Sequence, residues 1–492
     1  MMLGTIIFII IVAIVLAIGA YGYKISKKTV QDYAIAGGTL GYVVMAANAA
    51  ATLVSTGTMM GFMGSMYLMG LPYFTYLMMP IWHMAMLMLF LGSRFIAARE
   101  VYGHYSPIHT LHQRYGSRVF TLILAILWFF TCAIYAAMQF TGVATLIEAI
   151  VGIPFIWAAI VATIITVVYI LLGGYRAVAW TNVVWVVLYF LGFWIPAITL
   201  FTNYSVFDLA PKVDPKAFTL SGFVNYSAPL LLWTNIVNMW SGLGFIWSFY
   251  SIMGSRNLKI AKVSSLFGWL NYVILITPSF AIATIYGRAL LSPSQLPRVD
   301  LVFYKLIEIY LSATLTLPYA IAIVAAGIST AATLLLLQGV IIESGIVNLG
   351  LGIKLSQKAR INITRLGAIA GALTGLLIAL VLKLPVGLIF SYAMAFMGFT
   401  VPAVLGGLFW KKSNTTSAVL SMVAGVLVYI IGMFVKYPVP GNPTRFIVPP
   451  ELLYGFTICA LVYLIATPLT KHTKNEDVEM IDKLSAWIKE NA

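Results

Sequence analysis

The chain has 492 residues, of which 61% are hydrophobic and only 9% are charged. Soluble globular proteins carry about 25% charged residues, so this composition excludes a soluble protein and predicts one that crosses a lipid bilayer several times. The net charge of +15 fits basic loops at a membrane surface, and we expect no nucleic-acid partner. Cys132 and Cys459 both lie in apolar runs, which predicts neither a disulfide framework nor a metal cluster.

A helix needs about 20 apolar residues to cross a bilayer, and about thirteen segments of this chain reach that length. The first is a retained span and not a cleaved signal peptide, because its basic residues follow the apolar run instead of preceding it. We therefore predict an all-α polytopic membrane protein. Its spans lie at residues 3–23, 41–68, 71–95, 119–147, 153–172, 178–203, 228–253, 263–287, 313–342, 364–382, 385–409, 415–435 and 449–469.

The distribution of Lys and Arg predicts the orientation of these spans. Basic residues are retained on the cytoplasmic side, and most of the 29 Lys and Arg residues fall on that side when the chain starts outside. We therefore place the N-terminus outside and the C-terminus in the cytoplasm of a cell bounded by this plasma membrane. Apolar side chains at helical spacing in residues 476–489 predict an amphipathic helix, which lies on the inner membrane surface or docks on the protein's own loops.

Two spans are interrupted. Gly and hydroxyl residues break the second span between Ser55 and Ser65, and a similar interruption lies at residues 240–245 of the seventh. Such residues free backbone groups that must line an enclosed cavity, as in the broken helices of transporters. Close helix packing through small residues is the alternative. With the first span set aside, each interrupted helix opens a block of five spans, and an odd number of helices makes the two blocks inverted in topology.

This pattern divides the chain into five parts. They are the first helix and its loop (1–28), a first inverted repeat (29–203), a second inverted repeat (204–412), two further helices (413–470) and a cytoplasmic amphipathic tail (471–492).

Catalysis is not expected. Ionisable residues within the spans are few and scattered, and paired carboxylates and nucleophile–base spacings are absent from them. His104, His109 and His112 lie close together in one loop, but no Cys or carboxylate accompanies them, which disfavours a metal site.

Several segments carry a resemblance to a known family. They are DYAIAGGTLG (32–41), RYGS (114–117), GGYRAVAWTN (173–182), AAGISTAAT (325–333) and VPAVLGGLFWKK (401–412). With these motifs and the interrupted second span, the chain resembles the sodium:solute symporter family, and it looks closest to monocarboxylate, pantothenate or proline-type members. The resemblance implies a LeuT-type core of five plus five inverted helices and transport driven by a sodium gradient.

The resemblance also implies a sodium site between the second and ninth spans. Carried onto this chain, its ligands are the backbone carbonyls of Ala51, Val54 and Ala326 and the hydroxyls of Ser329 and Thr330. Independently of the family, a hard cation such as sodium prefers oxygen ligands, and Ser329 and Thr330 form an adjacent hydroxyl pair inside the ninth span. The alternative is that these hydroxyls bond back to carbonyls of their own helix.

One position departs from the family pattern. The family commonly has Asp in the sixth span where this chain has Asn182. An amide keeps an acceptor oxygen but loses the charge, so we expect a single sodium per cycle and regard Asn182 as the coupling position.

The solute site is predicted from residues beside the interruptions. A polyol would leave several hydroxyls unpaired among them, so we favour a small, partly apolar solute that bears a carboxylate, held by half-helix N-termini and the sodium ion. Packing or interfacial anchoring is the alternative role of each aromatic residue. The candidates are Thr56, Thr58, Tyr76, Tyr135, Gln139, Trp240, Trp247 and Tyr392.

We therefore predict a secondary active transporter that couples Na+ to a small organic solute by alternating access. One alternative is a proton-coupled or uncoupled carrier, which the neutral Asn182 favours. The other is a membrane-embedded sensor or channel component, but the segment after Leu469 is too short for the fused signalling domain usual in sensors. The sequence leaves the oligomeric state open.

Overall fold

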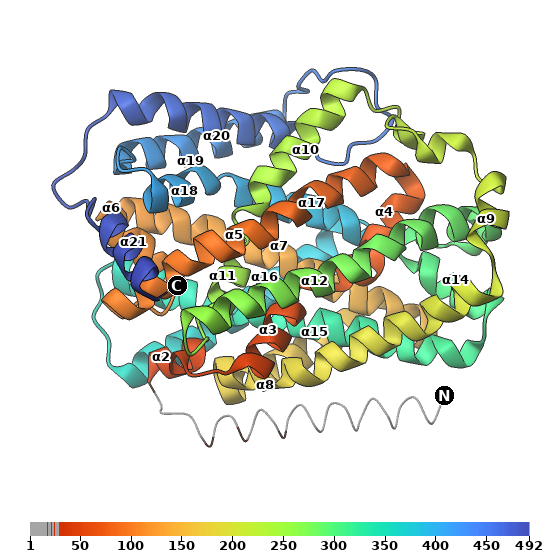
Figure 1. Ribbon diagram of the computed structural model, residues 1–492, viewed down its shortest axis with the longest axis horizontal. Coiled ribbons are helices and arrows are strands. Elements are labelled where there is room, and N and C mark those ends of the chain that lie inside the picture. Colours follow the sequence, from red (N-terminus) through yellow and green to blue (C-terminus); the bar gives the residue numbers. More distant parts are fainter. Residues whose placement is uncertain (1–16, 18–20, 22–23, 25–28, 492) are drawn as a thin grey trace.

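The computed structural model describes residues 17, 21, 24 and 29–491, so the predicted first span at residues 3–23 lies almost wholly outside the described residues. Over the described residues the chain is helical, and an isolated bridge between Leu40 and Ser255 is the β pairing found there. Most of the long helices run along one common direction (Figure 1).

The helices follow the predicted spans closely. Seven of those described are long and apolar enough to cross a membrane, or nine if each bent pair counts as one span. The predicted total of about thirteen is therefore not confirmed. The helices of these regions are α3 (Tyr42–Leu53), α4 (Phe62–Met69), α5 (Leu71–Tyr102), α7 (Arg118–Val151), α8 (Phe155–Asn203), α10 (Ala228–Gly242), α11 (Ile246–Ile252), α12 (Leu258–Phe280), α15 (Thr316–Val340), α16 (Gln357–Leu382), α17 (Val386–Gly398), α18 (Val401–Phe409), α19 (Thr415–Gly432) and α20 (Pro450–Leu469).

Both interrupted spans are broken in the structure. α3 and the helix that starts at Gly57 meet at an angle of 51°, and α10 ends at Gly242, with α11 starting at Ile246. α17 and α18 form a further bent pair, at 44°. The small and hydroxyl residues of these regions therefore mark real breaks and not only close packing.

The predicted fifth and sixth spans are joined into α8, which is kinked at Gly174. This glycine has φ 55° and ψ −150°, a backbone conformation that only glycine adopts readily. A Cβ atom at this position would also lie 2.8 Å from the carbonyl oxygen of Tyr33. Glycine is thus required here both by the backbone and by the close approach of Tyr33.

The most buried long helix is α15. Of the most apolar window of residues 313–350, 83% is buried inside the protein, against 33% for α16 and α19 and 39% for α20. α15 packs against α7, α8 and α16, whereas α16, α19 and α20 leave large apolar side chains such as Leu373 and Leu464 exposed. The centre of the fold is therefore α15, and the outer helices present a hydrocarbon surface to the bilayer.

The C-terminal helix α21 (Met480–Asn491) docks on the protein itself, which was one of its two predicted positions. It packs against α5, and Leu484 is fully buried. The Arg94 guanidinium donates to the Ile481 carbonyl at 2.8 Å and to the Ser485 hydroxyl at 2.7 Å. The tail is therefore held by specific contacts with α5.

Candidate functional site

The break after α3 exposes the last carbonyls of that helix. α3 ends at Leu53, and Val54 adopts an extended conformation with φ −83° and ψ 121°. Beyond the end of a helix, carbonyls lose their partners in the next turn, and the macrodipole makes this end electronegative. The carbonyls of Ala51 and Val54 are therefore suited to receive a cation or a hydroxyl donor.

α15 supplies two hydroxyls to these carbonyls. The Thr330 hydroxyl lies 3.1 Å from the Ala51 carbonyl and 2.8 Å from the Val54 carbonyl. The Ser329 hydroxyl lies 3.4 Å from the Ala51 carbonyl and 3.1 Å from that of Ala326. All five residues predicted to bind sodium therefore lie together, and the Thr330 hydroxyl points to α3 and does not bond back to its own helix.

An aromatic cluster lies beside the second break. We use this name for Phe62, Tyr135, Phe245, Trp247 and Phe390, which come from α4, α7, α11, α17 and the break before α11. The rings of Tyr135 and Trp247 are 4.5 Å apart between centroids, and Phe390 contacts the rings of both Tyr135 and Phe62. All five side chains are buried.

These features can be compared with known proteins. The chain matches the "Sodium:solute symporter family" over residues 33–425. It belongs to this family.

The symporter also resembles individual members of known function. It is 24% identical to the sodium/glucose cotransporter of Vibrio parahaemolyticus, over 98% of this chain and 92% of that protein. It is 27% identical to the high-affinity proline transporter of Bacillus subtilis, over 85% of this chain and 89% of that protein. A solved Na+-coupled sialic acid symporter, in a substrate-bound outward-open state, shares its fold with a TM-score of 0.75 and 17% identity, over 96% of this chain and 99% of that one.

Three of the predictions are thereby confirmed. The symporter has a LeuT-type fold, it moves a small solute through a membrane, and Na+ is its coupling ion. The placement of the N-terminus outside stays a prediction.

Three of the predicted solute residues hold the broken helix in shape instead of offering free groups. The Gln139 side-chain oxygen accepts from the Thr56 amide at 3.0 Å and from its hydroxyl at 3.1 Å. The Thr58 hydroxyl accepts from the Ser55 amide at 3.2 Å. Backbone groups freed by a break need partners in a buried setting, and these side chains supply them.

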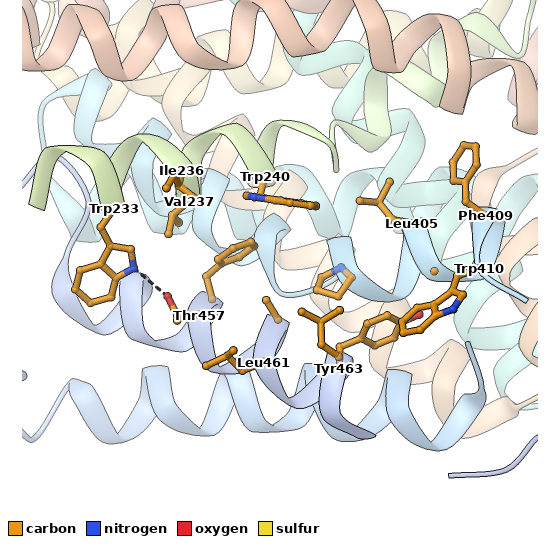
Figure 2. A pocket seen from close by; sticks show the side chains of 15 residues that line it. Trp233, Ile236, Val237, Trp240, Leu405, Phe409, Trp410, Thr457, Leu461 and Tyr463 are labelled. Carbon is orange, nitrogen blue, oxygen red and sulfur yellow. Dashed lines mark hydrogen bonds between the residues drawn. The ribbon is translucent and has the colours of Figure 1, made fainter. Parts of the chain in front are cut away.

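Two other predicted solute residues lie apart from the aromatic cluster. Trp240 is 42% exposed and faces an outer groove (Figure 2). Tyr392 is half-buried, and Phe390, two residues earlier on α17, contacts the cluster in its place. The prediction for Trp240 is corrected because the break between α10 and α11 turns it away from Trp247.

Two buried polar groups without partners lie just after the second break. Within the described residues no hydrogen-bond partner is found for the Trp247 indole nitrogen or the Ser248 hydroxyl, and both side chains are fully buried. Tyr76 on α5 is fully buried as well, beside Ser391. Since buried polar groups are almost always hydrogen-bonded, the donors of Trp247 and Ser248 are candidates for contact with a solute.

Asn182 joins three helices through a buried network. Its side-chain amide donates to the Asn48 oxygen at 2.8 Å, and the Asn48 amide donates to the Tyr175 hydroxyl at 2.8 Å and to the Ser251 carbonyl at 3.2 Å. These residues belong to α8, α3 and α11. Asn182 thus contacts α3 one turn before Ala51, and no sequence pattern indicated Asn48, Tyr175 and Ser251 as the other members of this network.

The three loop histidines do not gather around a metal. His104, His109 and His112 each hydrogen-bond a different hydroxyl, those of Thr110, Ser106 and Thr121. Burial lowers the pKa of His104 to about 4 and also lowers the pKa of His109 and His112. Over the described part of the chain, no group of three or more His, Cys, Asp or Glu residues could hold a metal ion.

Proposed function

We propose that the symporter binds one Na+ at the carbonyls of Ala51, Val54 and Ala326 and the hydroxyls of Ser329 and Thr330. The observation that supports this most strongly is the position of the Thr330 hydroxyl, 2.8 Å from the Val54 carbonyl across two different helices. Five neutral oxygens gathered at the C-terminal end of a half-helix suit a hard monovalent cation.

A sodium ion bound here would contact oxygens of both the broken helix α3 and the continuous helix α15. In the structure α3 is linked to Ser329 and Thr330 by hydroxyl contacts. A cation shared by both helices would order the break and the residues that follow it, and so raise the affinity for solute. Couplings of this kind are typically worth about 1–3 kcal/mol. Release of sodium into the sodium-poor cytoplasm would reverse the effect and complete alternating access.

We further propose that the solute is small, partly apolar and bears a carboxylate, as monocarboxylates, pantothenate and amino acids such as proline do. The faces of Tyr135 and Trp247 suit an apolar body. The unpartnered donors of Trp247 and Ser248 suit the oxygens of a carboxylate. The proline transporter of Bacillus subtilis is among the relatives, which supports this choice.

A sugar is the second candidate, because the sodium/glucose cotransporter of Vibrio parahaemolyticus is also a relative. A polyol needs a partner for each hydroxyl that it buries. In this structure Gln139 and Thr56 are already paired with each other, and Leu77 is a buried apolar side chain. The aromatic cluster therefore fits an apolar carboxylate better than a sugar.

The test is uptake by the purified symporter in liposomes, with radiolabelled monocarboxylates, pantothenate, proline and glucose. Each solute is offered with an inward sodium gradient, an inward proton gradient or neither. Accumulation of a carboxylate only with sodium supports the proposal and identifies the solute. Accumulation of glucose alone would refute the solute class, and accumulation driven by protons alone would refute the sodium site.

A further inference from the structure

An apolar groove of about 540 Å³ runs between α10, α18 and α20. Figure 2 shows Trp233, Trp240 and Trp410 along it, with Leu461 on the α20 side. Trp240 and Leu461 are 42% and 47% exposed, and α20 is one of the outer helices. The groove therefore opens on the hydrocarbon surface of the protein and is separate from the aromatic cluster and the sodium site.

Three of the lining residues have their polar atoms paired within the protein. The Trp233 indole donates to the Thr457 hydroxyl at 3.0 Å (Figure 2), and this hydroxyl in turn donates to the Leu453 carbonyl at 2.7 Å. The Tyr463 hydroxyl lies 2.5 Å from that of Ser413. Because these groups are already paired and most of the other lining side chains are hydrocarbon, the groove suits an apolar occupant.

The groove is elongated, and one of its ends is basic. Along α20 it extends from Phe456 to Leu464, which is about 12 Å at 1.5 Å per residue. α18 ends at Phe409 and α20 at Leu469, and the exposed Lys412 and Lys471 follow these ends.

These two lysines lie near each other and are available to a ligand. Thr470, next to Lys471, hydrogen-bonds the Asn414 side chain at 2.9 Å, which brings the segments after α18 and α20 together. Neither lysine forms an ion pair within the described residues, whereas Lys411 pairs with Asp482 at 2.7 Å. The end of the groove near Trp410 therefore carries free positive charge where α18 and α20 leave the membrane.

We propose that this groove binds an acyl chain of an anionic phospholipid, with the headgroup at Lys412 and Lys471. Basic residues immediately outside a membrane helix attract anionic lipids, and the hydrocarbon floor matches the chain. A second copy of this protein fits less well, because helices associate in membranes through open tracks of small residues. The glycine of this groove, Gly406, is already covered, since a Cβ there would lie 1.6 Å from the Tyr463 hydroxyl.

Photolabelling tests the proposal. The symporter is reconstituted with phosphatidylglycerol that carries a photoreactive group on its acyl chain, and labelled peptides are identified by mass spectrometry. We expect labels concentrated on α10, α18 and α20 and displaced by unlabelled phosphatidylglycerol more readily than by phosphatidylcholine. Ala460→Trp, which fills the groove, should abolish this labelling, and Leu373→Trp on the outer face of α16 should not.

A separate variant tests whether Lys412 and Lys471 bind the lipid headgroup. Lys412→Gln combined with Lys471→Gln should remove the preference for phosphatidylglycerol over phosphatidylcholine while labels stay in the groove. Equal labelling of α16 and the groove helices in the unsubstituted protein, or equal displacement by both lipids, would overturn the proposal. Chain-to-chain crosslinks through the groove would also overturn it, because they would identify a second copy as the occupant.

Discussion

Replacement of Thr330 by Val is the sharpest test of the sodium site. Valine keeps the shape of the side chain but removes the hydroxyl that lies 3.1 Å and 2.8 Å from the carbonyls of Ala51 and Val54. An interaction between a polar group and a charge contributes about 1.5–3 kcal/mol. Because 1.4 kcal/mol corresponds to a factor of ten, we expect the sodium concentration for half-maximal uptake to rise roughly 10- to 150-fold.

The assay is solute uptake into liposomes at constant ionic strength, with choline replacing sodium. Thr330→Ser should restore most of the sodium affinity, because it returns an oxygen to the same place. Thr163→Val is the matched control, since the Thr163 hydroxyl is buried and donates only to the Ala159 carbonyl of its own helix. A half-saturating sodium concentration unchanged in Thr330→Val would show that this hydroxyl only packs α15 against α3.

Three further predictions concern other parts of the structure. Trp247→Leu should raise the KM for solute by up to about tenfold, because an aromatic contact is worth about 0.5–1.5 kcal/mol. Trp180→Leu on the outer surface should leave this KM unchanged, and equal KM values in the two variants would contradict a solute role for Trp247. Gly174→Ala should lower the melting temperature in detergent, since strained backbone costs about 1–3 kcal/mol, whereas Gly41→Ala, which meets no atom within 4 Å, should not. Burial raises the pKa of Asp300 from 3.8 to about 6, so the contribution of Asp300 to stability is present below pH 4 and is lost as pH rises through 6. Asp300→Asn should therefore flatten the fall in melting temperature over this pH range. An unchanged fall would mean that another group causes this pH dependence.

The gathering of the five proposed sodium ligands was expected from the family resemblance, and the sequence adds local support for two of its parts. Small and hydroxyl residues after Leu53 indicate a break in the helix, and Ser329 and Thr330 form an adjacent hydroxyl pair on a helix that is buried in the structure. The sequence does not predict which residues far along the chain contact the residues of the break. Thr56 and Gln139, 83 positions apart, meet only because α7 crosses the break.

The grouping of the candidate solute residues around one cluster was predicted less well, and one reason is geometric. Trp240 and Trp247 are seven residues apart, so on a continuous helix they would share a face. The break between Gly242 and Ile246 rotates the two halves, so that Trp240 is 42% exposed while Trp247 is fully buried. Phe390 was not among the predicted residues because its ring has no polar group, and its place in the aromatic cluster rests on contacts with Tyr135 and Phe62 that only the packed structure reveals.

The charge at the proposed site connects the ion to the nature of the solute. None of the five proposed sodium ligands is charged, and the neighbouring Asn48 and Asn182 are neutral amides. A cation that enters a site of low polarity without a counter-charge is unfavourable, and opposite charges about 4 Å apart attract by about 4 kcal/mol near a protein surface. A carboxylate on the solute would supply the missing charge, so each of the two should bind more tightly when the other is present.

This reasoning predicts a measurable difference between the solute and its uncharged amide. Once the uptake panel has identified the solute, sodium affinity is measured by tryptophan fluorescence at saturating concentrations of each compound. We expect the carboxylate to raise sodium affinity about 5- to 150-fold, the range of typical couplings of 1–3 kcal/mol, and the amide to raise it much less. The same increase with both compounds would mean that sodium acts on the solute only by ordering α3, and that charge compensation comes from another part of the symporter.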